Sequence, residues 1–301
     1  MRREMHLKLV STCTVIVLFC SAYAEAGTWT TFDKPGASFT RIFDIDGSNL
    51  VGMYSDTSGD HGFLYNGTNW TTIDKPGTSW MHIYGIDGSN LVGSYGDASG
   101  DHGFLYNTTS QSWTTTLKVG TSDTYLVGID SSNLVGCYGN SSNGHGFIYD
   151  TITQSLTIHD KPEASNTDIY GIDGSSLVGR YHDDSGWHGF LYDGTTWTTL
   201  DVPVLGVIDT RINKIDGSNL VGIYINASGN HGFLYNTISQ SWTLLDYPGA
   251  SGTEIWGIDG TTLVGRYWDA SGGHGVIYTI PEPTTLLLLG LGAVIVRRKR
   301  S

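Results

Sequence analysis

The chain has 301 residues, of which 16 are Lys or Arg and 29 are Asp or Glu, so its formal net charge is −13 at pH 7. An acidic surface disfavours nucleic acid and anionic lipid as partners, because their phosphate groups would be repelled. The three cysteines are Cys13, Cys20 and Cys137, and only Cys137 lies outside the N-terminal segment. We therefore expect no internal disulfide.

The N-terminal segment, residues 1–26, has the parts of a secretory signal peptide. A basic stretch precedes an apolar stretch over residues 9–20, and small-x-small cleavage sites end at Ala24 and Ala26. The apolar stretch is shorter than the roughly 20 residues that span a bilayer, which favours a cleaved signal over a retained anchor. The sequence therefore predicts export across the inner membrane.

A repeat fills residues 27–280. A His-Gly pair recurs with spacings of 41, 43, 43, 43 and 43 residues, beginning at His61, His102, His145, His188, His231 and His274. Leu-Val-Gly and Ile-Asp pairs recur in step with it. Self-similarity at such a period indicates a solenoid or a propeller.

Each copy contains four short stretches of β-branched and aromatic residues, separated by clusters of Gly, Asn, Asp and Ser. In the second copy the four stretches are residues 81–86, 91–95, 102–106 and 113–117. This pattern is typical of strands joined by tight turns. Each copy is therefore predicted to form a four-stranded antiparallel meander.

Six such meanders bury both faces of every sheet when they stand radially, which predicts an all-β, six-bladed β-propeller. An open β-solenoid is the alternative. Residues 28–32 supply only a fourth strand, whereas the last copy stops after a third strand at residues 274–279. We expect these two strands to pair and close the ring, because closure removes exposed sheet edges.

The repeat unit, "HGFLYNGTNWTTIDKPG" followed by "IDGSNLVGSY", resembles the HAF family of extracellular repeats. The resemblance covers residues 28–280. It implies an exported bacterial repeat protein and brings no catalytic residues with it.

Polar residues that recur in every copy are predicted to be structural. A metal site needs several ligands that converge on one ion, whereas the six histidines lie on six blades. The aspartates of the Ile-Asp pairs fit Asx-turn capping: Asp46, Asp87, Asp130, Asp173, Asp216 and Asp259. Loops 56–60 and 97–101 offer carboxylates to calcium but lack the ligand ladder of an EF-hand, which favours turn formation. We expect no metal and no other cofactor.

A ligand site is expected where the copies differ. The most variable polar position is the start of the first, channel-side strand, whose residues would ring one mouth of the channel: Arg41, His82, Tyr125, Asp168, Arg211 and Glu254. Such a set suits a sugar or a short peptide, and solvated strand ends are the alternative. Asp44 and Lys214 replace a glycine of the other copies and are expected near the channel.

The C-terminal segment, residues 281–301, reads "PEPTTLLLLGLGAVIVRRKRS". Pro281, Glu282 and Pro283 precede an apolar run over residues 286–296, and a basic cluster follows it. This order resembles the PEP-CTERM sorting signal of Gram-negative bacteria. The resemblance implies transient anchoring in the inner membrane, processing by an exosortase-type enzyme, and a place at the cell surface or outside the cell. The short apolar run and its basic end fit such an anchor.

The sequence contains no Ser nucleophile elbow, zinc motif or phosphate loop. A glycoside hydrolase or lyase would need two carboxylates roughly 5 to 9.5 Å apart, and the best candidates, Asp168 and Glu254, would lie two blades apart. We therefore predict a non-catalytic surface or extracellular-matrix protein that binds polysaccharide, in keeping with the exopolysaccharide production that accompanies the PEP-CTERM signal.

Overall fold

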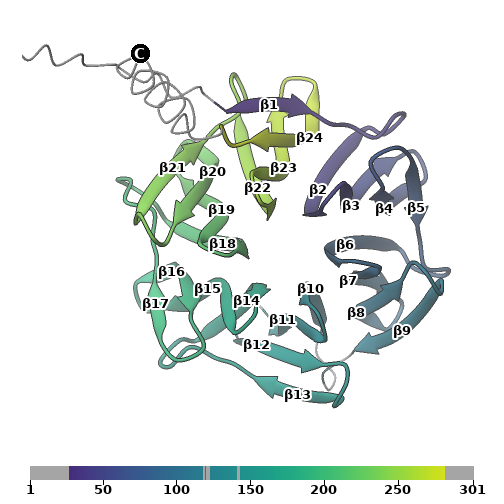
Figure 1. Ribbon diagram of the computed structural model, residues 1–301, viewed down its shortest axis with the longest axis horizontal. Helices are drawn as coiled ribbons and strands as arrows, with labels where there is room; N and C mark the ends of the chain where they lie inside the picture. Colours follow the sequence, from purple (N-terminus) through teal and green to yellow (C-terminus); the bar gives the residue numbers. More distant parts are fainter. Residues whose placement is uncertain (1–26, 118, 120–122, 141–142, 282–301) are drawn as a thin grey trace, which may run out of the picture. The chain divides into compact units, whose positions relative to one another are not determined.

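The structure is a computed structural model that describes residues 27–117, 119, 123–140 and 143–281. These residues form 24 strands in six four-stranded antiparallel sheets, without a helix. The sheets stand as blades around a central channel (Figure 1), and residues Gly27–Ile280 form one compact unit. The predicted six-bladed β-propeller is confirmed.

The blades are numbered in chain order, each from its innermost strand outwards. Blade 1 contains β2 (Phe39–Asp46), β3 (Asn49–Asp56), β4 (Gly59–Tyr65) and β5 (Trp70–Ile73). Blade 2 contains β6 (Trp80–Asp87), β7 (Asn90–Asp97), β8 (Gly100–Asn107) and β9 (Ser112–Leu117). Blade 3 contains β10 (Thr124–Asp130), β11 (Asn133–Asn140), β12 (Asn143–Asp150) and β13 (Ser155–Ile158).

The second half repeats this plan. Blade 4 contains β14 (Asn166–Asp173), β15 (Ser176–Asp183), β16 (Gly186–Tyr192) and β17 (Trp197–Thr199). Blade 5 contains β18 (Asp209–Asp216), β19 (Asn219–Asn226), β20 (Gly229–Asn236) and β21 (Ser241–Leu245). Blade 6 contains β22 (Gly252–Asp259), β23 (Thr262–Asp269), β24 (Gly272–Thr279) and β1 (Thr28–Thr31).

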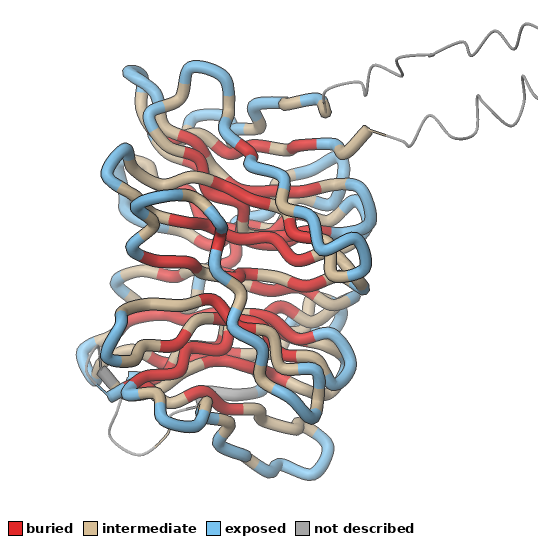
Figure 2. Tube along the Cα trace, turned by 90° about the vertical axis from the view of Figure 1, so that its left-hand side faces the viewer, coloured by how far each residue is buried: buried red, intermediate tan, exposed pale blue. Residues whose placement is uncertain are grey.

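The hydrophobic core lies between neighbouring blades, where Figure 2 shows the buried middle of the strands. Val51 of blade 1, for example, packs with Ile83 and Phe104 of blade 2, and all three are at most 1% exposed. The Leu and Val residues of the Leu-Val-Gly repeats supply this core. The Gly residue lets the backbone of the adjacent strand approach closely. A Cβ on Gly52 would lie 2.0 Å from the carbonyl oxygen of Arg41 on the adjacent strand, so only glycine fits.

Blade 6 is closed by strands from the two ends of the repeat region. Strand β1 pairs antiparallel with β24, in the register Thr28↔Thr279 to Thr31↔Val276, and the Phe32 amide donates to the carbonyl oxygen of Gly275 at 2.8 Å. The predicted pairing of residues 28–32 with 274–279 is confirmed. This pairing excludes the open solenoid, because a solenoid would leave the edges of β1 and β24 unpaired.

The two processing segments lie mostly outside the described residues. This holds for Ala24, Ala26, Glu282, Pro283 and the apolar run 286–296, while Pro281 is described and half-buried. Within the described part of the chain no helix is long and apolar enough to cross a membrane. Cleavage at either end therefore stays a prediction.

Candidate functional site at the channel mouths

The innermost strand of each blade carries a one-residue β-bulge next to the channel, at Phe43 in blade 1 and at the equivalent residue of every other blade. A bulge bends its strand and re-aims the side chains near it. Residues before the bulge lead to one mouth of the channel, which we call the variable mouth. Residues after it lead to the opposite one, the aspartate mouth.

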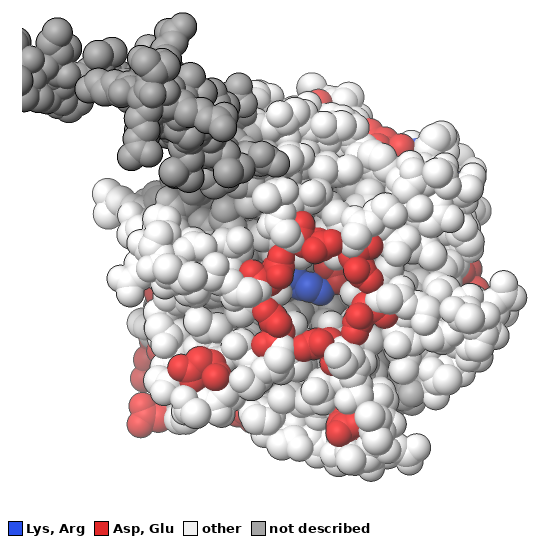
Figure 3. All heavy atoms as spheres, in the orientation of Figure 1, with Lys and Arg blue, Asp and Glu red and all other residues white. Residues whose placement is uncertain are grey.

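The aspartate mouth is ringed by the carboxylates of the six Ile-Asp pairs, which Figure 3 shows around a single cation. Each carboxylate accepts a hydrogen bond of 2.6–2.8 Å from the first backbone amide of the equivalent turn in the next blade. The ring is cyclic, because Asp259 of blade 6 accepts from Gly47 of blade 1. The aspartates thus cap turns as predicted, but the turn of the neighbouring blade and not their own.

The cation at this mouth is Lys214, whose Nζ lies 2.5 Å from Oδ2 of Asp44. Asp44 is completely buried and also accepts a hydrogen bond from the Ile86 amide at 3.1 Å. Burial raises the pKa of Asp44, and the Lys214 ammonium opposes that rise. The two residues that replace glycine therefore lie at the channel, as predicted, and form an ion pair between blades 1 and 5.

The six residues predicted as a ligand site lie at equivalent positions of the innermost strands, at the variable mouth. Each is paired with a residue of the second strand: Met53, Ser94, Cys137, Arg180, Ile223 and Arg266, in blade order. These partners differ as much as the predicted residues do. Several of the six are bound into ion clusters, and their role in ligand binding stays a prediction.

Glu254 is the centre of the first cluster and is only 4% exposed. It accepts hydrogen bonds from Arg266 at 2.7 and 3.0 Å, from Asn230 at 2.7 Å and from the Trp256 indole at 2.9 Å. Arg41 lies 3.7 Å away. Both carboxylate oxygens are therefore used within the fold.

Asp168 is the centre of the second cluster. It accepts hydrogen bonds from Arg180 Nε at 3.1 Å and from the Tyr170 hydroxyl at 3.0 Å. Arg180 also donates to Asp209 at 2.9 Å, and Arg211 lies 3.9 Å from Asp209. Like Glu254, Asp168 is bound by a guanidinium group within the fold.

The two remaining predicted residues have neutral side chains. Burial, and then the neighbouring Arg41 charge, lowers the pKa of His82 to about 4, so its imidazole is uncharged at neutral pH. Its Nδ1 lies 3.1 Å from the Tyr84 hydroxyl. Tyr125 donates its hydroxyl proton to Asp101, and burial together with that bond raises the pKa of the Tyr125 phenol.

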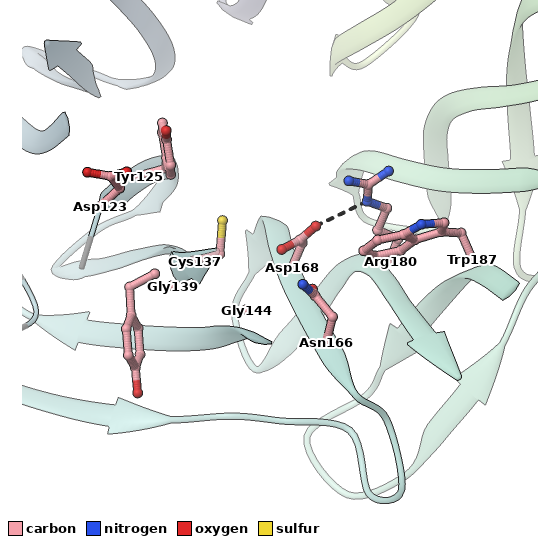
Figure 4. A pocket seen from close by; sticks show the side chains of 10 residues that line it. Asp123, Tyr125, Cys137, Gly139, Gly144, Asn166, Asp168, Arg180 and Trp187 are labelled. Atoms are coloured by element: carbon pink, nitrogen blue, oxygen red, sulfur yellow. Dashed lines mark hydrogen bonds and ion pairs between the residues drawn. The ribbon is translucent and has the colours of Figure 1, made fainter. Parts of the chain in front are cut away.

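A pocket of about 430 Å³ opens at the variable mouth between blades 3 and 4. Its lining includes Tyr125, Cys137, Asn166, Asp168, Arg180 and Trp187. Figure 4 shows the Asp168–Arg180 ion pair beside Trp187, with Asn166 next to Asp168. The volume is within the range of roughly 300–1,000 Å³ that is typical of small-molecule sites.

The pocket exists because blade 3 has small residues where its neighbour has large ones. Cys137, Gly139 and Gly144 occupy the register positions that Arg180, His182 and Trp187 occupy in blade 4.

From the sequence, Tyr125 and Asp168 are predicted at this mouth, whereas Cys137, Asn166, Arg180 and Trp187 of the pocket lining are not. Comparing the second and third strands of the repeats, and not only the first, would have revealed the run of small residues.

The repeated histidines form a side-chain array that resembles a Ser-His-Asp triad. Ser58 Oγ lies 2.9 Å from His61 Nε2, and His61 Nδ1 lies 2.6 Å from Asp74. However, Ser58 donates its proton to Asp56, which is also 3.3 Å from Nε2. Burial lowers the pKa of His61, but Asp74 and Asp56 together raise it above its ordinary value. Because the Ser58 proton is already committed to Asp56, the array lacks the serine-to-histidine hydrogen bond of a catalytic triad.

Arrays of the same kind recur around His188, His231 and His274. In each, the imidazole ties a turn serine to an aspartate that follows the outer strand. These contacts support the structural role predicted for the histidines, because each imidazole links side chains of two different segments of its blade.

The Asp-containing loops also use their carboxylates internally. Asp56 accepts from the amide and the hydroxyl of Ser58, at 2.7 and 2.5 Å, and Asp97 does the same with Ser99. These bonds fit the predicted role in turn formation. No group of three or more His, Cys, Asp or Glu suited to a metal occurs among the described residues.

Comparison with known protein families identifies a sorting signal at the C-terminal end of the chain. The PEP-CTERM protein-sorting motif matches residues 279–300. The tail is a PEP-CTERM sorting motif. It marks the chain as an exported protein that goes to the cell surface or the extracellular space after exosortase-type processing. No curated protein sequence matches the chain.

Solved structures share the propeller fold at low sequence identity. A protein assigned as TolB from Agrobacterium tumefaciens has a TM-score of 0.55 at 14% identity, over 80% of this chain and 90% of that one. TolB from Acinetobacter baumannii has a TM-score of 0.51 at 7% identity, over 80% of this chain, and this chain spans 63% of its length.

The β-propeller domain of the Trilobed protease from Pyrococcus furiosus has a TM-score of 0.53 at 10% identity, over 82% of this chain and 95% of that one. That propeller has an open velcro topology, whereas here β1 pairs with β24. At these identities the comparisons show the fold alone.

Proposed function

We propose that the protein is a non-catalytic surface or extracellular-matrix protein that binds an extracellular polysaccharide at the variable mouth of its propeller. The pocket between blades 3 and 4 carries this proposal, because it is a concave site with several polar groups in its lining, on an exported protein. Hydroxyl, amide, carboxylate and indole groups line it, and a few polar groups beside aromatic side chains are typical of small-molecule sites. The resemblance of the repeats to the HAF family fits an extracellular role.

The alternative, a glycoside hydrolase or lyase, has less support. Hydrolysis needs one carboxyl group as a general acid and a second as a base or nucleophile. Asp168 and Glu254, the two candidates, are each bound to an arginine at 3.1 Å or less. Each carboxylate therefore already serves a neighbouring arginine within the fold, which favours the binding function over the enzyme.

A glycan array probed with the exported protein tests the proposal. We expect binding to at least one class of extracellular polysaccharide, and no release of reducing ends when the bound glycan is incubated with the protein. A uniform blank across the array would reject polysaccharide binding. Release of reducing ends that Glu254→Gln abolishes would establish the enzyme instead.

A further inference from the structure

The pocket between blades 3 and 4 contains a buried polar atom that has no hydrogen-bond partner among the described residues. Asn166 is 5% exposed and lines the pocket, and its Oδ1 has no hydrogen-bond partner among the described residues. Leaving such an atom unpaired costs about 1–3 kcal/mol. A ligand that donates a hydrogen bond to Asn166 would recover part of that free energy.

The charges around the pocket favour a cation over an anion. Asp123, Asp168 and Arg180 are the charged groups in its described lining. Arg180 binds Asp168 at 3.1 Å and Asp209 at 2.9 Å, and Asp209 also lies 3.9 Å from Arg211, so these two carboxylates and two guanidinium groups balance one another. Asp123 is exposed and forms no ion pair with a described residue, and its Oδ1 accepts a hydrogen bond from the Asp101 amide at 3.2 Å. Among the described residues of the lining, the net charge is therefore negative.

Other groups in the lining also present acceptors. The Tyr125 hydroxyl proton is committed to Asp101, which leaves the phenol oxygen able to accept a hydrogen bond. Burial, and to a smaller extent the neighbouring Asp168, raises the pKa of the Cys137 thiol, so this residue adds no anion and no nucleophile. A donor-rich ligand therefore matches the pocket better than a uronate, sulfate or phosphate group does.

We propose that this pocket binds an amino sugar, a hexose unit with a protonated amine, in which the ammonium group is placed near Asp123 and a hydroxyl or ammonium group donates to Asn166. The inference rests on the proposed function for the sugar part of the ligand. The pocket itself supplies the selection for a positive charge. Acidic polysaccharides are excluded from it by the same carboxylates.

Isothermal titration of the exported protein tests the inference with four probes: a glucosamine oligomer, an N-acetylglucosamine oligomer, a galacturonate oligomer and a lysine oligopeptide. We expect the glucosamine oligomer to bind, the acetylated one to bind about tenfold more weakly, and the other two not to bind. Asp123→Asn and Asn166→Ala should each weaken glucosamine binding about tenfold, the loss expected for one hydrogen bond to a charged or buried group.

Asp184→Asn is the matched control, because it removes the same charge from an exposed residue outside the pocket. It should leave affinity within about twofold, as expected for a screened surface charge. Equal weakening by Asp184→Asn and Asp123→Asn would show non-specific attraction and overturn the inference.

Preferential binding of the acetylated or the acidic oligomer would overturn the amino-sugar inference while leaving polysaccharide binding intact. Equal binding of the lysine oligopeptide would overturn the sugar assignment. Failure of all three oligosaccharides, together with a blank array, would reject the proposed function itself.

Discussion

His274 and Asp33 join the two ends of the repeat region through side chains. The imidazole Nδ1 lies 2.8 Å from Asp33, and Nε2 lies 3.4 Å from Asp269. The Asp33 contact raises the pKa of His274 above its ordinary value of 6.5, against the opposing effect of burial. Since the pKa is higher in the folded state, this stabilisation is complete below pH 6.5 and is lost as pH rises through the folded value.

Asp33→Asn should therefore lower the melting temperature more at pH 6 than at pH 9, because only the protonated imidazole gains from the carboxylate. Thermal unfolding followed by circular dichroism at the two pH values measures this. Glu163→Gln, which removes an exposed carboxylate of the loop between β13 and β14, is the control and should change both melting temperatures equally. If Asp33→Asn lowered the melting temperature equally at the two pH values, the pair of His274 and Asp33 would make no pH-dependent contribution to stability.

Lys214 and Asp44 form a buried pair whose members have unequal surroundings. Lys214→Gly leaves the completely buried Asp44 without a counter-charge and should lower the free energy of unfolding by about 3 kcal/mol or more. Asp44→Gly should cost less, because Lys214 still lies among the six aspartates of the mouth. The double variant restores the glycines of other blades and should be more stable than Lys214→Gly alone. Urea unfolding measures all three, and equal losses in the two single variants would contradict this order.

Strand β1 is the element on which ring closure depends. Trp29 packs against Tyr278 with a centroid distance of 4.5 Å, and the pairing with β24 satisfies backbone groups along four residues. Deleting residues 28–32 would expose the edge of β24 and unpair those groups. We expect the free energy of unfolding to fall by about 3 kcal/mol or more, from the lost aromatic packing and hydrogen bonds.

Hydrogen exchange locates that effect. Amides of β24 should exchange faster in the deleted chain, while amides of β20, the equivalent strand of blade 5, should keep their protection. Unchanged exchange in β24 would show that the blade does not need its fourth strand. Equal acceleration in every blade would show that the ring opens as a whole.

The strands could be predicted from the sequence because each signal is repeated six times, so a weak local preference at one copy is corrected by the other copies. Closure could be predicted because residues 28–32 and 274–279 are complementary fragments of one repeat. The pocket could not be predicted in this way, because it is the space that the side chains of two neighbouring blades leave between them. Cys137 and Gly144 are unremarkable in their own strands and matter only opposite Asp168 and Trp187.

The aspartate ring shows a similar limit at the level of the whole molecule. The sequence identified Asp46 as a turn residue, but the amide that it caps belongs to Gly88, 42 residues further along the chain. Contacts between blades follow only from the three-dimensional spacing of the blades around the axis. Because these contacts repeat around the whole ring, blade 6, where the two ends of the repeat region meet, is joined to its neighbours in the same way as the other blades.

This equivalence predicts that the chain ends can be moved. In blade 1 the strand pair Tyr65↔Trp70 is joined by the turn Asn66-Gly67-Thr68-Asn69, and in blade 6 the same register pairs Trp29 with Tyr278. Joining Tyr278 to Trp29 through Asn-Gly-Thr-Asn, and opening the chain between Asn66 and Asn69, transfers the closure from blade 6 to blade 1. The aspartate ring and the inter-blade core are unchanged by this permutation.

The permuted protein should keep the circular dichroism spectrum of the native one and melt within a few degrees of it, because a change of about 1 kcal/mol shifts the melting temperature of a chain of this size by roughly 2–4 °C. The matched control opens the chain between Tyr54 and Ser55, inside β3, with the same new linker. That variant should lose cooperative unfolding, since the break falls within a central strand. If the permutant opened between Asn66 and Asn69 also lost cooperative unfolding, the prediction would be wrong. The closing strand would then have to lie in blade 6, and the blades would not be equivalent in stability.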